Sequence, residues 1–425
     1  MPGTRTGAAS TTLTELPPRD RLLTVRPRTG LTMAPNQALS HGHDPHPATR
    51  PLSGRIRRTA VAAVAGLTAV ALLSACSYGS KNDDKKTNTA APAGDSASSG
   101  AAAKLSADIV RIGYFANLTH GTPLVGLQDG IFQKELGATQ IKTQVFNAGP
   151  AEIEALNAGS IDIGWIGPSP AINGFTKSEG KSLKIIGGSA SGGVKLVANP
   201  DKITSLDDLK GKKIATPQLG NTQDVALLNY LAGKGFKVDA QSGAGDVSVV
   251  RSDNKVTPDA YKQGSIDAAW VPEPTASKLV TLGAKVLLNE KDIWPDKKFV
   301  ITNIIVSQKF LAEHPDVVEA VLRGSVTTNA YIKANPDKAK ATANEAIKKE
   351  AGNALEPAIL DPAWADIDFL DDPLASTLQT EADNAVTAGL LKKPNLNGIY
   401  DLTLLNKVLK EKGQSPVADA GLGAK

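Results

Sequence analysis

A short string of residues occurs twice in this chain, and the repeat limits the folds that the chain can adopt. Gly-Ser-Ile-Asp-Ile-Gly-Trp at residues 159–165 returns as Gly-Ser-Ile-Asp-Ala-Ala-Trp at residues 264–270. Each copy follows a short helical pattern and precedes a proline-rich turn, at residues 166–170 and 271–274. Chance repetition of one string would not extend to the flanking elements. The repeat therefore predicts two equivalent units.

From residue 109 onward the sequence alternates short β-branched runs with helical patterns. The runs at residues 110–115, 141–146 and 161–165 predict strands, and residues 213–216 correspond to the first of them in the second unit. Short strands alternating with helices indicate open, largely parallel sheets that helices cover on both faces. The expected fold class is α/β.

Two runs are predicted to cross between the units, at residues 194–199 and 299–306. We therefore expect residues 109–198 with 300–425 to form lobe I and residues 199–299 to form lobe II. Two lobes joined by two strands form a hinge beside a cleft, and ligands bind where sheet strands end at such a cleft.

The segment before the first lobe predicts a membrane anchor. Arg55, Arg57 and Arg58 precede an apolar stretch at residues 59–73, which is too short to span a bilayer comfortably. The run Leu-Ser-Ala-Cys then ends at Cys76, and the whole pattern resembles a bacterial lipoprotein signal. That resemblance implies a diacylglycerol on the Cys76 thiol.

Residues 1–76 are accordingly assigned to the leader and signal peptide, and residues 77–108 to a disordered tether. The alternative for Cys76 is a buried core cysteine. The tether is rich in Lys, Asp, Ser, Ala and Gly and cannot pack, which argues against that alternative.

Composition excludes several functional classes. The net charge is +4, but residues 1–58 hold nine arginines and three acids, so the remainder carries 4 − 6 = −2. No basic footprint for nucleic acid survives. Cys76 is the only cysteine, which excludes disulfides within the chain and thiolate metal sites. No later segment is apolar enough to span a membrane.

The sequence lacks the residue patterns that nucleophilic or metal-dependent catalysis requires. After the signal the only histidines are His120 and His314, and there is no Gly-x-Ser-x-Gly elbow or cluster of metal ligands. Asp162 and Asp267 could be paired carboxylates, but their repeated positions suggest a structural role. We expect no enzyme activity, no cofactor and no metal.

Five motifs of this chain resemble those of solute-binding proteins of ABC importers, of the aliphatic-sulfonate, taurine and nitrate type. They lie at residues 117–121 (Asn-Leu-Thr-His-Gly), 146–150 (Phe-Asn-Ala-Gly-Pro), 166–169 (Ile-Gly-Pro-Ser), 216–224 (Thr-Pro-Gln-Leu-Gly-Asn-Thr-Gln-Asp) and 270–274 (Trp-Val-Pro-Glu-Pro). The resemblance implies a type II periplasmic-binding fold, ligand capture between the lobes, permease and ATPase partners, and a lipid-anchored, extracytoplasmic location on the cell membrane. Thr275 departs from it, because relatives often carry an aromatic residue there.

Neutral hydrogen-bond donors gather where predicted strands end and helices begin. They are Asn117, Thr119, His120, Asn147, Ser169, Ser191, Gly192, Gln218, Asn221 and Thr222. Free backbone N–H groups and the helix dipole favour an anion at such places. Helix capping prefers the same residue types and is the alternative for each one alone. Together they favour a site for a strongly acidic oxyanion such as a sulfonate.

Three further residues are candidates for the ligand's other end. Trp165 and Trp270 stand at repeated positions and could sandwich an aliphatic tail, or they could be core residues. Glu273 could cap a helix, or accept from the ammonium of a taurine-like ligand. Nitrate and thiamine-precursor pyrimidines are alternative ligands of this fold, and an enzyme of the same fold is a further alternative.

The anchor prediction is tested by Cys76→Ser. The variant should lose its lipid and leave the membrane fraction, because stable anchoring takes two or more buried acyl chains. Cell fractionation measures this, with Ser74→Ala, a substitution two residues before the cysteine, as the matched control. A Cys76→Ser protein that stays in the membrane fraction would contradict the lipoprotein assignment.

Overall fold

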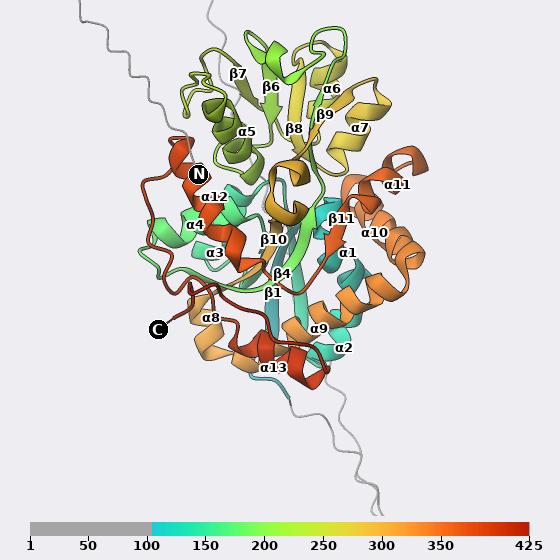
Figure 1. The fold of residues 1–425 in the computed structure, drawn as a ribbon. Helices are drawn as coiled ribbons and strands as arrows, with labels where there is room; N and C mark the ends of the chain where they lie inside the picture. The colour runs from blue at the N-terminus through green and yellow to red at the C-terminus, as the bar shows by residue number, and fades with distance from the viewer. Residues whose placement is uncertain (1–103, 425) are drawn as a thin grey trace, which may run out of the picture. The chain divides into compact units, whose positions relative to one another are not determined.

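The computed structural model describes residues 104–424, which contain two β-sheets flanked by helices (Figure 1). The first sheet has the strand order β11-β4-β10-β3-β1-β2. Its strands are β1 (Ile109–Phe115), β2 (Gln140–Phe146), β3 (Ile163–Ile166), β4 (Leu183–Gly192), β10 (Val300–Ser307) and β11 (Ile367–Phe369). β1 runs parallel to β2 and β3, whereas β10 runs antiparallel to both of its neighbours.

The second sheet repeats this arrangement with the order β9-β5-β8-β6-β7. Its strands are β5 (Val194–Ala198), β6 (Lys213–Thr216), β7 (Ser248–Arg251), β8 (Ala268–Pro272) and β9 (Lys285–Asn289). β6 is parallel to β7 and β8, and β5 is antiparallel to β8 and β9. The five strands of the second sheet therefore correspond to β4, β10, β3, β1 and β2 of the first, and β11 has no counterpart. The prediction of two α/β lobes is confirmed.

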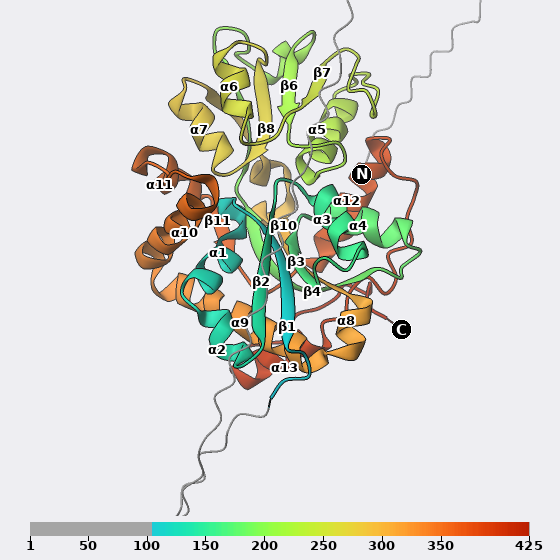
Figure 2. The same ribbon diagram turned by 180° about the vertical axis from the view of Figure 1, so that it is seen from behind.

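Helices lie on both faces of each sheet, as Figures 1 and 2 show from opposite sides. Against the first sheet pack α3 (Gly149–Asn157), α4 (Pro168–Lys177) and α12 (Ala375–Thr387) on one face, and α1 (Gly121–Gln128), α9 (Pro315–Ala334) and α13 (Thr403–Glu411) on the other. Around them lie α2 (Ile131–Leu136), α8 (Gln308–Glu313), α10 (Pro336–Ala351) and α11 (Pro357–Ala365). The second sheet carries α5 (Thr222–Gly233) on one face and α7 (Thr275–Thr281) on the other, beside α6 (Thr257–Lys262). Short 3₁₀ turns complete the elements, η1 (Leu118–His120), η2 (Leu206–Leu209), η3 (Glu290–Ile293) and η4 (Pro295–Lys297).

The two repeated aspartates do the same structural work in each lobe. The Asp162 carboxylate accepts a hydrogen bond from the backbone N–H of Arg111 at 2.8 Å, beside β1. The Asp267 carboxylate accepts from the backbone N–H of Lys213 at 2.9 Å, beside β6. Each also forms an ion pair, with the Arg111 and Lys202 side chains respectively. They fix the start of the parallel strands and are not a pair of catalytic carboxylates.

The crossings between the lobes differ from the prediction. β5, which the sequence assigned to lobe I, pairs with β8 and β9 in the second sheet. The chain therefore crosses at Gly192 and Gly193, whose φ angles of 79° and 71° suit glycine, and returns through η3 and η4. A sharp turn between two consecutive strands leaves no break in the hydrophobic pattern. The end of the first segment of lobe I was therefore predicted too late in the sequence.

The predicted disordered tether also extends too far. Among its last residues, the backbone N–H of Ser106 donates to the Asp316 carboxylate at 2.7 Å, and Ala107 is buried. The helical pattern over residues 124–136 forms two helices, because Gly130 separates α1 from α2 in the left-handed region at φ 69°. Cys76 and residues 1–103 lie outside the described residues.

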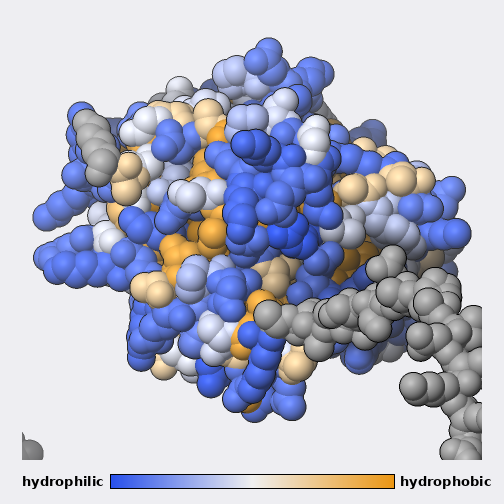
Figure 3. Space-filling model, turned by 90° about the horizontal axis from the view of Figure 1, so that it is seen from below, coloured by the Kyte–Doolittle hydropathy of each residue, from blue (hydrophilic) through white to orange (hydrophobic). Residues whose placement is uncertain are grey.

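The C-terminal helix α13 shows how the outer helices are held. Leu405, Val408 and Leu409 recur at helical spacing and are buried, and α13 packs on α9. The end of the molecule that carries these helices is mainly hydrophilic, with hydrophobic residues in separate small areas (Figure 3). Within residues 104–424 no helix is both long and apolar enough to cross a membrane.

Glu152 lies in an unusual position at the centre of the first lobe. It projects from α3 onto the sheet, is fully buried, and has no hydrogen-bond partner among the described residues. Its Oε1 lies only 2.7 and 2.4 Å from where Cβ atoms of residues 113 and 164 would stand, so the glycines at these positions leave the space that the Glu152 carboxyl occupies. Burial raises the pKa of this carboxyl well above its ordinary value, which favours the neutral acid in the folded protein.

Glu152→Gln should therefore stabilise the protein at neutral pH. The unfolded chain releases this proton near pH 4.5, whereas the folded chain keeps it, so the wild type loses stability as pH rises. The free energy of unfolding falls by about 1.4 kcal/mol per pH unit until the buried carboxyl ionises. The glutamine variant has no such carboxyl, so its free energy of unfolding should not show this fall. Urea unfolding between pH 4 and 8 measures the difference. Glu154→Gln, an exposed position on the same helix, is the control, and equal pH profiles for both variants would contradict the prediction.

Candidate functional site

A small pocket lies where strands of both sheets end. It encloses about 330 Å³ of space, part of it open to solvent. Its lining residues are Phe115, Asn117, Thr119, His120, Asn147, Gly167, Asn221, Thr222, Gln223, Asn254, Pro272 and Ile301. Apart from Ile301, which lies at the start of β10, they follow or end β1, β2 and β3 of the first sheet and the equivalent β6, β7 and β8 of the second. The pocket therefore occupies the cleft edge at which α/β sheets bind ligands.

The polar lining is entirely uncharged. Six of the ten donors expected from the sequence line the pocket, and they are Asn117, Thr119, His120, Asn147, Asn221 and Thr222. No lysine, arginine, aspartate or glutamate is among its lining residues. A ligand here meets neutral hydrogen-bonding groups from both lobes and no counter-ion.

Three helices begin at this pocket. Asn147 stands just before α3, Gly167 is the N-cap of α4, and Asn221 is the N-cap of α5. The first N–H groups of a helix have no partner within it and point toward whatever lies beyond its N-terminus. Their partial positive charge favours an anion in the pocket.

Thr222 approaches the first lobe closely at this point. Its Oγ1 lies 2.3 Å from where a Cβ of residue 167 would stand, so any side chain at that position would force Thr222 to move. The hydroxyl is buried and has no hydrogen-bond partner among the described residues. In contrast, the Asn221 side chain accepts from the backbone N–H of Gln223 at 3.1 Å, so for Asn221 the capping alternative is what the structure shows.

His120 is a neutral donor in this setting. Its ring stacks on Phe115 with centroids 4.3 Å apart, and its Nδ1 accepts from the Phe115 backbone N–H at 3.3 Å. The proton therefore sits on Nε2. Burial lowers the pKa of the imidazole to about 3, so His120 carries no charge at neutral pH.

The motif over residues 216–224 is held by its last residue. The buried Asp224 carboxylate accepts from the Thr216 hydroxyl at 2.7 Å and from the Gly220 backbone N–H at 3.0 Å. Arg251 neutralises it, with Nε 3.0 Å from Oδ1. This fixes the loop that presents Asn221 and Thr222, and it explains why an acid can stand beside the pocket without repelling an anion.

The tryptophan pair belongs to the cores of the lobes, which corrects the proposed sandwich. Trp165 is fully buried and packs edge-on against Phe132 at 5.5 Å. Trp270 is also fully buried, and its Nε1–H donates to Glu290 at 2.7 Å. Neither residue lines the pocket. Side chains alternate across a strand, and these two face the helices rather than the cleft end.

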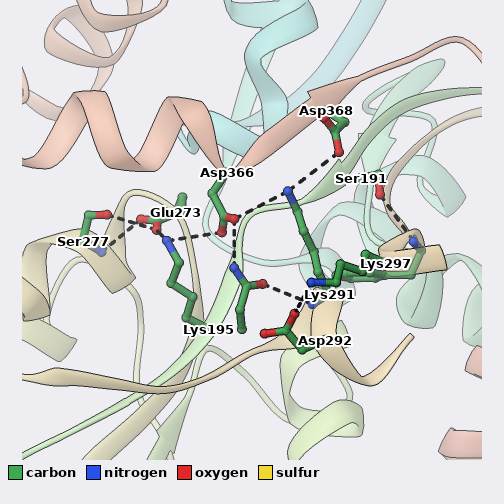
Figure 4. Close-up of polar contacts among 11 residues, drawn as sticks. Ser191, Lys195, Glu273, Ser277, Lys291, Asp292, Lys297, Asp366 and Asp368 are labelled. Carbon is green, nitrogen blue, oxygen red and sulfur yellow. Dashed lines mark hydrogen bonds and ion pairs between the residues drawn. The ribbon is translucent and has the colours of Figure 1, made fainter. Parts of the chain in front are cut away.

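Glu273 is not free to receive a ligand's ammonium. Its carboxylate is fully buried, lies 2.5 Å from the Lys195 ammonium, and accepts from the backbone N–H and hydroxyl of Ser277, both at 3.0 Å. Figure 4 shows these contacts together with Asp366, which lies 3.2 Å from the same ammonium. The structure thus supports the capping alternative for Glu273, with an ion pair added.

The Lys195 ion pair joins the two lobes. Lys195 lies on β5 of the second sheet, whereas Asp366 directly precedes β11 of the first. Burial opposes the charged ammonium, but Glu273 and Asp366 outweigh it and raise the pKa of Lys195. Lys291, which follows β9, adds a contact of 3.5 Å to Asp366. Lys291 also lies 3.7 Å from the more exposed Asp368, so two ammonium groups meet three carboxylates at the hinge (Figure 4).

The other expected donors lie outside this pocket. The Ser191 hydroxyl accepts from the Phe299 backbone N–H, and Gly192 forms the turn between β4 and β5. Gln218 is half-buried in the loop before α5, where its backbone carbonyl accepts from Asn221. Ser169 lines a different cavity beside Leu219. These four residues are near the crossings or the cleft but do not contact this pocket.

Sequence reasoning missed several lining residues. Asn254 is the clearest case, because it follows β7 as Asn147 follows β2, so the internal repeat contained the signal. Phe115, Gly167, Pro272 and Ile301 are apolar or lack a side chain, and no pattern of donors identifies them. Within the described part of the chain, no group of three or more His, Cys, Asp or Glu residues is placed to hold a metal ion.

Comparison with known proteins identifies relatives of this arrangement. The profile of the NMT1-like family matches residues 103–347. A Bacillus subtilis protein provisionally named an aliphatic sulfonates-binding protein is 27% identical over 292 residues, 67% of this chain and 83% of the relative. The taurine-binding periplasmic protein of Escherichia coli is 28% identical over 213 residues, 50% of this chain and 63% of the relative.

A solved structure shows the same fold. The alkanesulfonate-binding protein SsuA from Xanthomonas axonopodis pv. citri, bound to MOPS, aligns with a TM-score of 0.56 at 22% identity. The alignment covers 68% of this chain and 96% of that protein. At this identity the likeness concerns the fold, and it agrees with the predicted type II periplasmic-binding architecture.

Lys195→Met should destabilise the protein by about 3 kcal/mol or more, because removing Lys195 leaves the fully buried Glu273 carboxylate without a counter-charge. Urea unfolding at neutral pH measures the change. Lys202→Met is the matched control, because its ammonium is 40% exposed and its ion pair with Asp267 is worth at most about 1 kcal/mol. Equal losses in the two variants would show that the Lys195 cluster does not hold the hinge.

Proposed function

The protein belongs to the NMT1-like family, and from that premise we propose that it is the solute-binding protein of an ABC importer. It captures a small organic anion between its lobes, and an aliphatic sulfonate is the anion that its pocket fits best. The observation that carries this proposal is the uncharged, donor-rich lining at the starts of three helices from both lobes.

The chemistry of a sulfonate matches this lining. A sulfonate is fully ionised at physiological pH, needs donors for three oxygens and has no proton to give. Asparagine, threonine and neutral histidine side chains supply donors, and the helix N-termini supply partial positive charge. Neutral donors avoid the desolvation of a buried cation while still forming hydrogen bonds to a charged group, which are among the stronger ones in proteins.

The relatives support the same class of function. Those compared above are named as binding proteins for aliphatic sulfonates or taurine. Glu273 already neutralises Lys195 and is not free to accept from a ligand's ammonium. This favours a plain sulfonate over one that carries an ammonium at its far end. An enzyme would need a nucleophile or a base at the pocket, and burial lowers the pKa of His120, the titratable side chain in its lining, to about 3, which makes it a weak base.

Location and partners follow from the same proposal. A solute-binding protein works on the outer side of the membrane and hands its ligand to a permease driven by an ATPase. The lipoprotein signal that ends at Cys76 would tether the lobes there through residues 77–108, a segment that lies mostly outside the described residues.

A ligand screen tests the proposal. Thermal shift of the purified protein should show stabilisation by alkanesulfonates, because a ligand at a hundred times its dissociation constant adds about 2.7 kcal/mol. Taurine, nitrate, sulfate, thiamine precursors and alkanoates of matched length complete the panel. Stabilisation by nitrate or a pyrimidine alone would replace the sulfonate assignment, and turnover of any of these compounds would favour an enzyme.

Thr222→Val tests the pocket itself. The change removes one donor without changing the side chain's outline, and hydrogen bonds to charged groups are worth about 1.5–3 kcal/mol, so sulfonate affinity should fall about tenfold or more. The melting temperature without ligand should not fall, because this hydroxyl has no partner in the protein. Calorimetry measures both variants, with Thr403→Val on the exposed start of α13 as control. Unchanged affinity in Thr222→Val would move the site elsewhere.

A further inference from the structure

A second cavity shares three lining residues with the pocket described above. Asn117, Asn147 and Asn254 line both. We call the second one the tail cavity, and its other lining residues are Ala116, Phe146, Asp253, Lys255, Pro274, Thr275, Lys278, Ile347 and Ala351. It encloses about 500 Å³ of space, part of it open to solvent. Because the two cavities share these residues, a ligand whose sulfonate lies among the neutral donors would direct its far end toward the tail cavity.

The tail cavity contains a lysine whose ammonium makes no ion pair with a carboxylate of residues 104–424. Lys278 lies on α7 and is half-buried. Burial lowers the pKa of its ammonium, and no carboxylate of the described residues acts against that effect. Lys195 on the neighbouring β5 is different, since two carboxylates contact it and its pKa is raised. A half-buried ammonium that no protein group neutralises is suited to an acidic group brought by a ligand.

The remaining charges of the tail cavity do not cancel this ammonium. Asp253 also lines the cavity, but its Oδ1 accepts from the Lys255 backbone N–H at 2.8 Å, and the Lys255 side chain lines the cavity as well. One carboxylate and two ammonium groups leave a net charge of +1. The apolar side chains of Phe146 and Ile347 provide contact for a short aliphatic segment between the two ends of a ligand.

We propose that Lys278 recognises a second acidic group, so that the preferred ligands are short sulfonates with a carboxylate at the opposite end. This inference rests on the proposed function, because it takes a sulfonate in the first pocket as given. The same ammonium disfavours a ligand whose far end is itself an ammonium, such as taurine. Lys278 is therefore a specificity-determining residue, while the neutral donors hold the sulfonate that all these ligands share.

Calorimetry with matched ligand pairs tests this assignment. Sulfoacetate, 3-sulfopropanoate and 4-sulfobutanoate are compared with methane-, ethane- and propanesulfonate on the wild type, Lys278→Met and Lys278→Arg. The distance from the first pocket to Lys278 decides which chain length binds best. For at least one pair, the ratio of the affinity of the dianion to that of the plain sulfonate should be about ten, the minimum expected for a hydrogen bond between charged groups. Lys278→Met should reduce that ratio to about one, and Lys278→Arg should keep it above one.

Controls separate this effect from folding and from net charge. Lys262→Met removes a charge from an exposed position on α6 outside both cavities and should keep the wild-type ratio. Melting temperatures confirm that each variant is folded. A ratio near one in the wild type, or a preference that survives Lys278→Met, overturns the inference and leaves the sulfonate function intact. If no sulfonate of either kind binds, both proposals fall together.

Discussion

The ammonium of Lys195 is the contact on which the arrangement of the lobes depends. It stands on the central antiparallel strand of the second sheet and meets Glu273 at the end of β8 and Asp366 before β11 of the first sheet. Charges removed from water are tolerated only when they are paired, and loss of one partner is strongly unfavourable. The hinge is therefore set by electrostatics as well as by the two crossings of the backbone.

That arrangement gives the pocket its chemistry. With Glu273 and Asp224 each neutralised by a basic side chain, neither of these two carboxylates opposes an anion at the ends of the strands. The positive ends of α3, α4 and α5 can then act together with neutral side chains on one anion. An anion site built this way does not depend on the titration of its own donors, because His120 stays neutral at physiological pH.

Much of the fold and part of the site could be predicted from the sequence, for identifiable reasons. The repeated string over 159–165 and 264–270 revealed the two lobes, because strand and turn residues keep their order in both copies. The donors in the loops after β1, β2 and β6 were predicted because ligands bind where the strands of α/β sheets end, and polar residues in those loops indicate such a site. The direction of Trp165 and Trp270 was not predictable, because a strand-end tryptophan has the same sequence signature on either face. The partners of Glu273 come from residues far away in sequence, which no local pattern reports.

The order of strands also has a consequence for how the chain acquires its structure. All five strands of the second sheet come from one continuous stretch, β5 to β9, whereas the first sheet is incomplete until β10 enters between β3 and β4. During synthesis lobe II can thus complete its folding before lobe I, since domains fold as units when they emerge. Its folding pairs Lys195 with Asn289, so the two ends of the insertion meet. The long loop is then already closed, and β10 arrives beside β4 without the entropy loss that such a loop would otherwise impose.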